Sequence, residues 1–305
     1  MNFNKNLLFA AIIILAAGCS DDGDCTSDQS LDSSGGSCSE TLTVSQQYSE
    51  TSSGGNRVIL ANAIPVHAVG LFGSISGALN PNAIAEQNLT YTITSSPTET
   101  GNLVSLLGTS GPDYSFGILF NGVELDPIAA EPFPHGDRND PNANWEWNLE
   151  ALNVQIGLDC NNAHVQPNGK YHYHGVPSLF IQDLNPSSSE MTLIGYAADG
   201  FPIYYKYAYT DASDTTSAVI EMTSSYSMKS GDRPGDGDTA PCDAYNGVYS
   251  ADYEYIAGSG TLDEANGRFG VTPGFPSGTF YYVITEAFPS IPRYFRGTPS
   301  NDFAI

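Results

Sequence analysis

Apolar and polar residues alternate in many short runs along the chain, and helical periodicity is scarce. The alternation predicts strands at residues 57–61, 89–94, 116–120, 202–209, 218–222 and 279–285. Gly, Pro, Asn and Asp separate these runs, a spacing typical of a β-sandwich or an irregular β architecture. The best helical candidate is the segment 145–152, Trp-Glu-Trp-Asn-Leu-Glu-Ala-Leu. We therefore predict an all-β fold with one β-rich domain over residues 46–305, since no long linker divides that range.

The first residues resemble an export signal. Lys5 gives a positive start, and residues 7–17 form an apolar run of about eleven residues, too short to span a bilayer. Leu-Ala-Ala-Gly-Cys at residues 15–19 resembles a bacterial lipoprotein cleavage site. We expect a lipoprotein signal peptide at 1–18 and a lipid anchor on Cys19, which places the protein at the outer membrane or cell surface. A plain secretory signal with a free Cys19 is the alternative.

Residues 19–45 are rich in Ser, Gly and Asp and poor in apolar residues. Such a segment buries too little surface to fold, so we expect a flexible acidic tether. Cys25 and Cys38 lie inside it, where pairing with each other would not constrain the domain. Cys160 and Cys242 lie in the folded part and are the natural disulfide in an oxidising compartment, although sequence alone does not prove the pairing.

The charge of the chain narrows the range of partners. The formal net charge is -24, with ten Lys plus Arg. Such an acidic protein repels phosphate groups, which excludes nucleic acid and anionic lipid surfaces as partners. The sequence also contains no Gly-x-Ser-x-Gly elbow, no P-loop and no dinucleotide-binding fingerprint.

Three of the five histidines, His164, His172 and His174, lie within the stretch NAHVQPNGKYHYHG at residues 162–175. The stretch predicts a β-hairpin, with two competing loops. A two-residue Asn-Gly loop pairs His164 with Tyr173 and points it away from the other two histidines. A three-residue loop with Gly169 in the left-handed position places His164 opposite His172, with His174 on the same face. Pro167 favours the second loop, because it has no N–H to donate in the first.

Three imidazoles on one face of a hairpin suit copper or zinc. Opposed Cβ atoms lie about 5 Å apart, so the rings can converge on one ion. Calcium and magnesium are disfavoured because they prefer oxygen ligands. His67 is the expected remote fourth ligand, and His135 is the next choice. Two alternatives remain open: structural histidines that bond to nearby Asn and Asp groups, and metal-free acid–base chemistry.

Residues 158–174 are similar in sequence to residues 262–282, which suggests an internal repeat. Both segments suggest a loop, a turn and an aromatic strand. Arg268 takes the place of His164, and Tyr281 takes that of His172. The second copy therefore has a similar scaffold without the histidines.

The chain resembles the YHYH-domain family, whose tetrapeptide is Tyr-His-Tyr-His at residues 171–174. The resemblance spans residues 55–300 and includes further ordered blocks. Among these are Asn-Ala-His-Val-Gln-Pro-Asn-Gly at 162–169, Ile-Gly-Tyr-Ala-Ala-Asp-Gly-Phe-Pro-Ile-Tyr at 194–204 and Leu-Asp-Glu-Ala-Asn-Gly-Arg at 262–268. The family implies an exported, mostly bacterial protein, but no established reaction.

Two functional hypotheses follow. In the first, a lipid-anchored β domain binds copper or zinc through His164, His172, His174 and His67, and acts as a metal-dependent hydrolase, a redox protein or a metal-capture protein. In the second, the domain is a metal-free surface module for glycans, a small molecule or a protein partner, and the histidines are structural. Metal content that depends on His172 and His174 distinguishes the two.

Overall fold

The computed structural model describes residues 30–135 and 138–305. The expected signal peptide at 1–18, the anchor at Cys19 and the tether residue Cys25 lie outside the described residues. Within the described part, no helix is both long and apolar enough to cross a membrane. Strands dominate it, with one α-helix, α1 (Ser178–Leu184), so the all-β expectation is confirmed.

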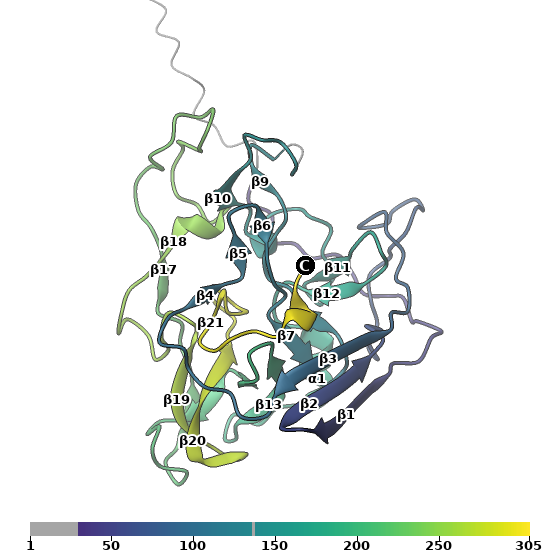
Figure 1. Cartoon of the computed structure of the whole chain (residues 1–305). Helices are drawn as coiled ribbons and strands as arrows, with labels where there is room; N and C mark the ends of the chain where they lie inside the picture. Colours follow the sequence, from purple (N-terminus) through teal and green to yellow (C-terminus); the bar gives the residue numbers. More distant parts are fainter. Residues whose placement is uncertain (1–29, 136–137) are drawn as a thin grey trace, which may run out of the picture.

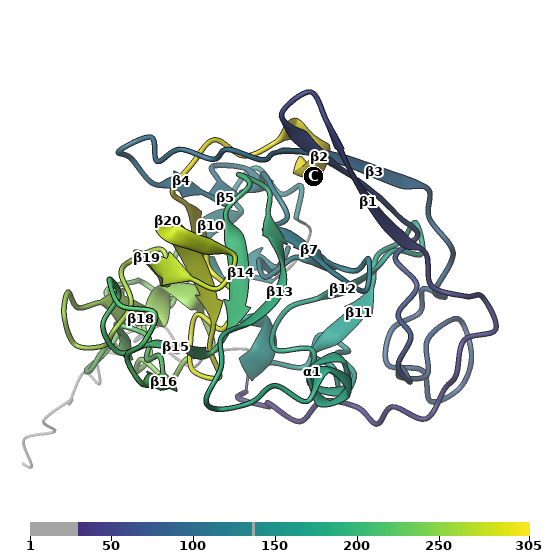
Figure 2. The same ribbon diagram turned by 90° about the horizontal axis from the view of Figure 1, so that it is seen from below.

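An eight-stranded mixed sheet forms the centre of the molecule (Figures 1 and 2). Across the sheet the strands are β11 (Ala163–Val165), β12 (Tyr171–Tyr173), β8 (Glu124–Leu125), β7 (Gly117–Leu119), β13 (Thr192–Ala197), β14 (Pro202–Tyr205), β20 (Phe275–Ile284) and β19 (Gly267–Thr272). Neighbouring strands are antiparallel, except that β12 runs parallel to β8 and β14 runs parallel to β20.

Smaller sheets surround this centre. A three-stranded antiparallel sheet contains β1 (Tyr48–Ser53), β2 (Asn56–Ala61) and β3 (Leu89–Thr94). Two-stranded sheets pair β4 (Val104–Ser105) with β21 (Tyr294–Phe295), β5 (Leu107–Gly108) with β6 (Gly111–Pro112), β9 (Pro132–Phe133) with β10 (Asn144–Asn148), β15 (Tyr207–Tyr209) with β16 (Val219–Glu221), and β17 (Tyr226–Met228) with β18 (Tyr253–Tyr255). Three 3-10 helices are Ala151–Asn153, Ser250–Asp252 and Asn301–Phe303. In both Figure 1 and Figure 2, the β1–β3 sheet and β18 lie on opposite sides of the central sheet.

The central sheet consists of two similar halves. In each half a hairpin, β7–β8 or β13–β14, is joined in parallel by one strand of a later hairpin, β11–β12 or β19–β20. The two halves meet where β7 and β13 pair antiparallel. The later hairpins share their register, since His164 pairs with His172 and Arg268 pairs with Tyr281.

The predicted strands are present, with two corrections. The segment 202–209 is two strands, β14 and β15, because Lys206 adopts a positive φ of 31° between them. The segment 145–152 is not a helix: β10 continues to Asn148, and only a short 3-10 turn follows. Trp145 and Trp147 are buried and Glu146 is exposed, the period-two alternation of a strand.

The cysteine pairing differs from the expectation. Cys38 forms a disulfide with Cys160, and Cys242 belongs to a different disulfide. The predicted Cys160–Cys242 pairing is therefore wrong, and Cys38 is not free to pair with Cys25. Within the described part of the predicted tether, the Gly36 amide donates to the Leu158 carbonyl at 2.8 Å, so this part contacts the domain.

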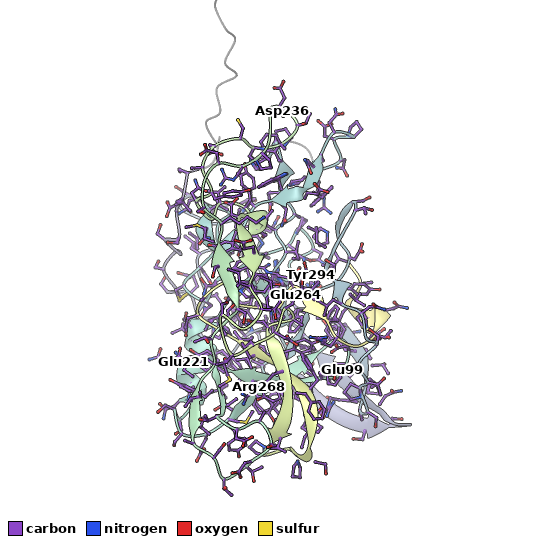
Figure 3. All side chains as sticks on the ribbon, turned by 90° about the vertical axis from the view of Figure 1, so that its left-hand side faces the viewer. Glu99, Glu221, Asp236, Glu264, Arg268 and Tyr294 are labelled. Carbon is purple, nitrogen blue, oxygen red and sulfur yellow. A yellow bond between two sulfur atoms is a disulfide. The ribbon has the colours of Figure 1, made fainter. Side chains whose placement is uncertain are left out.

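Acidic side chains lie on the surface that Figure 3 shows. Glu99, Glu221, Asp236 and Glu264 are all exposed there. The main core is largely apolar and aromatic, with Tyr171 and Tyr173 fully buried, and some charged side chains, among them Asp126 and Arg233, are buried as well.

Candidate metal centre

The turn chemistry of residues 166–170 sets the register of the histidine hairpin. The Gln166 amide donates to the Lys170 carbonyl at 3.0 Å, and the Gly169 amide donates to the Gln166 carbonyl at 2.8 Å. Gly169 has a φ of 89°, which favours glycine. The three-residue loop is therefore confirmed, and the register with His164 opposite Tyr173 does not occur.

The three histidine side chains converge through their Nε2 atoms. His174 Nε2 lies 3.0 Å from His172 Nε2 and 3.1 Å from His164 Nε2. His172 and His174 are 2% and 3% exposed, and His164 is half-buried. Among the His, Cys, Asp and Glu side chains of the described residues, these three form the one group close enough to share an ion.

Backbone carbonyls fix the tautomers of two of the rings. His164 Nδ1 lies 3.0 Å from the Ile156 carbonyl oxygen, and His172 Nδ1 lies 3.3 Å from that of Lys170. A carbonyl only accepts, so both Nδ1 atoms carry the proton and both Nε2 atoms present a lone pair. This arrangement is typical of histidines that bind a metal through Nε2.

Burial keeps the cluster uncharged at neutral pH. It lowers the pKa of His164, and it lowers the pKa of His172 and His174 well below 6.5, with a further contribution from the neighbouring histidines. Neutral imidazole is the form that binds a metal. The apo site is therefore ready for an ion without the release of protons above pH 6.5.

A pH dependence of metal affinity follows from these shifts. Since burial lowers the pKa of His172 and His174 well below 6.5, these two histidines remain neutral as the pH falls from 8 to 6.5. We expect metal affinity to be constant over that range and to fall at lower pH, when protons begin to compete for Nε2. Chelator competition between pH 5 and pH 8 measures this. A loss of affinity that is half complete at or above pH 6.5 would contradict it.

The histidines line a cavity of about 370 Å³ that also contains Asp126, Glu131 and Arg138. Asp126 is 4% exposed, and its Oδ2 accepts a hydrogen bond from Gln166 Nε2 at 3.1 Å. Its Oδ1 has no hydrogen-bond partner. Burial raises the pKa of the Asp126 carboxyl to about 7, and the nearby charge of Glu124 acts in the same direction.

Asp126 is absent from the site residues that the sequence predicts, because the sequence shows the alternation of its segment but not the pairing of that segment with the histidine strand. In Val-Glu-Leu-Asp at residues 123–126, Leu125 is a core residue between two carboxylates. Alternation places Glu124 and Asp126 on the opposite face, and Glu124 pairs with His172 across the sheet. The carboxylates therefore share a face with the histidines.

His67 lies on the other side of the hairpin and is not the fourth ligand. Its Nε2 is 2.6 Å from the hydroxyl of Tyr173, which also accepts a hydrogen bond from Asn121 Nδ2 at 2.7 Å. Tyr173 alternates with His172 and His174 and points into the core. The expectation that His67 completes the cluster is corrected: its imidazole satisfies a buried hydroxyl.

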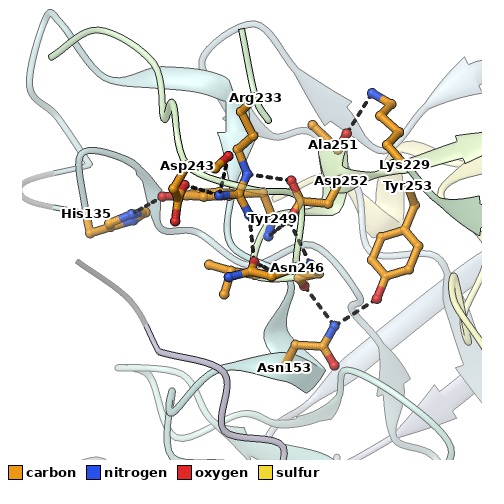
Figure 4. Close-up of polar contacts among 12 residues, drawn as sticks. His135, Asn153, Lys229, Arg233, Asp243, Asn246, Tyr249, Ala251, Asp252 and Tyr253 are labelled. Carbon is orange, nitrogen blue, oxygen red and sulfur yellow. Dashed lines mark hydrogen bonds and ion pairs between the residues drawn. The ribbon is translucent and has the colours of Figure 1, made fainter. Parts of the chain in front are cut away.

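His135 also belongs to a different part of the molecule (Figure 4). Its Nε2 lies 2.9 Å from the Tyr249 hydroxyl. Beside it, Arg233 donates to both carboxylate oxygens of Asp252 at 2.8 and 2.6 Å and to Asn246 Oδ1 at 2.6 Å. This buried network ties the segment after β17 to the 3-10 helix at Ser250–Asp252.

A comparison with known protein families matches residues 90–297 to the family described as YHYH protein. The chain belongs to the YHYH protein family. The matched range contains the whole eight-stranded sheet and the histidine hairpin. Comparisons with curated proteins and with solved structures give no match.

Proposed function

We propose that this YHYH protein binds one transition-metal ion, copper or zinc, through Nε2 of His164, His172 and His174. The convergence of the three Nε2 atoms carries the proposal. Two nitrogens bound to one tetrahedral ion at roughly 2.0–2.1 Å lie roughly 3.3–3.4 Å apart. The two pairs that involve His174 need to widen by only about 0.3 Å to reach that spacing, and all three ligand atoms lie within 4.8 Å of one another.

The hydrogen bonds of the cluster support an ion over a purely structural role. His164 and His172 both present an Nε2 lone pair toward His174 Nε2. That atom carries at most one proton, so one buried lone pair has no donor within the cluster. An unsatisfied buried polar group is costly, whereas one cation accepts all three lone pairs. Imidazole ligands favour copper and zinc over calcium and magnesium.

We further propose that the protein is exported and held at the outer membrane or cell surface by a lipid on Cys19. The disulfide between Cys38 and Cys160 supports an oxidising compartment, because disulfides rarely persist in the cytosol. The cavity beside the histidines supports an open coordination position for an exogenous ligand.

Metal content tests the proposal. The protein is secreted as a chain that includes Cys38, because Cys38 forms the disulfide with Cys160. It is incubated with Cu or Zn and desalted, and its metal content is measured by ICP-MS. We expect close to one metal ion per chain, and the same for a His67→Gln variant, whose glutamine can still accept from the Tyr173 hydroxyl. A metal-free wild-type protein would contradict the proposal and favour the glycan- or partner-binding hypothesis. Loss of metal in the His67→Gln variant would contradict the ligand set.

A further inference from the structure

The unpartnered oxygen of Asp126 needs a ligand that the protein itself does not supply. Gln166 holds Oδ2, so the carboxyl group is fixed in place, while Oδ1 is buried without a partner. Both residues line the cavity that the three histidines line. Buried acceptors are nearly always satisfied in folded proteins, by protein groups, water or a ligand. A molecule in this cavity is the available donor.

The second half of the sheet provides an internal comparison. Leu125 pairs with Gly117 and Tyr173, and Ile203 pairs in the same way with Gly195 and Tyr282, which aligns the halves residue by residue. The positions of His164, His172 and His174 are taken in the second half by Arg268, Tyr281 and Val283. Tyr204 takes the position of Asp126, and Gly270 takes that of Gln166. The carboxylate and its amide partner are therefore absent where the histidines are absent.

The scaffold is similar in both halves. Asn121 bonds to the hydroxyl of Tyr173 at 2.7 Å, and the equivalent Asp199 accepts from the hydroxyl of Tyr282 at 2.5 Å. The turn before each later hairpin is also the same, with Asn162 and Asn266 at φ values of 55° and 51°. Since the sheet forms without a carboxylate at the position of Asp126, this residue is not required by the fold.

We propose that Asp126 Oδ1 accepts a hydrogen bond from a small ligand bound at the open position of the metal. This rests on the proposed metal site. Asp126 is not among the groups close enough to the histidines to share the ion, so it acts on the ligand. At pH 8 the cavity therefore favours small molecules with an N–H or O–H group, such as water, alcohols and neutral nitrogen bases. It disfavours anions that have no proton to donate.

Ligand titrations of the Cu(II)-loaded protein at pH 8 test this, with azide as the anion and imidazole as the N–H donor, followed by visible absorption. The Asp126→Asn side chain has the same shape, and its amide oxygen can still accept from Gln166. Its amide N–H₂ group then stands in place of the unpartnered oxygen Oδ1, so a donor replaces an acceptor. We expect this variant to bind azide about tenfold more tightly and imidazole about tenfold more weakly than the wild type. Glu131→Gln, which removes a carboxylate from the same cavity, should change either constant less than threefold.

Unchanged titrations in Asp126→Asn, or equal changes in Glu131→Gln, would overturn the inference. Loss of copper from Asp126→Asn would overturn it as well, because Asp126 would then be a metal ligand. If Asp126→Asn does not fold, Gln166→Met releases the carboxyl group from its anchor and should weaken imidazole binding several-fold; no change would overturn the inference. A wild-type protein that takes up no copper would contradict the proposed function itself, and the inference with it.

Discussion

Replacing both His172 and His174 with alanine is expected to abolish stoichiometric metal binding. The variant retains one of the three converging Nε2 atoms, that of His164. Loss of a hydrogen-bond partner that orients a metal-binding side chain already lowers metal affinity about 10–100-fold. Loss of two metal-binding side chains should therefore lower the affinity at least about 10⁴-fold. Chelator competition on the wild type and the double variant measures the difference.

The matched control is His135→Ala, which removes a histidine outside the cluster that contacts Tyr249. Its metal affinity should stay within about threefold of the wild type, even if its stability falls. If the double variant kept metal within tenfold of the wild type, the ion would be bound elsewhere, and the three-histidine site would be wrong.

Removal of the Cys38–Cys160 disulfide is expected to cause the largest loss of stability. The bond closes a loop with a sequence separation of 122 residues, and cross-links that close long loops restrict the unfolded chain most. We expect Cys38→Ser/Cys160→Ser to lower the free energy of unfolding by about 3–5 kcal/mol. Urea unfolding of both proteins under non-reducing conditions measures this.

Removal of the disulfide should lower the free energy of unfolding without removing the metal site. The histidine hairpin is held by its own turn and by its pairing with β8, so the folded variant should still bind one metal ion. A change in unfolding free energy below about 1 kcal/mol would show that the segment before β1 is not anchored to the domain through this bond.

Local turn chemistry explains why the histidine hairpin could be predicted. Pro167 excludes one loop, Gly169 supplies the left-handed residue of the other, and the alternation of side chains then determines which residues share a face. These are interactions within a dozen residues, so the sequence contains the information. The similarity of the second hairpin could be seen for the same reason.

Long-range contacts explain what could not be predicted. The partner of Cys160 depends on the path of residues 30–45 along the domain, and the role of His67 depends on its position behind Tyr173. Asp126 reaches the histidines because β8 joins β12 in parallel, a pairing with no local signature. In the 145–152 segment, β10 pairs with β9, and this strand pairing overrides the helical pattern.

X-ray absorption at the metal edge of the loaded wild-type protein tests the three-histidine ligand set directly. We expect three nitrogen ligands at roughly 2.0–2.1 Å with the outer-shell scattering of imidazole rings, and one further light-atom ligand from the cavity. That first shell should disappear in the His172→Ala/His174→Ala variant. A shell that contains sulfur, or an oxygen-only shell without imidazole scattering, would contradict a metal centre built from His164, His172 and His174.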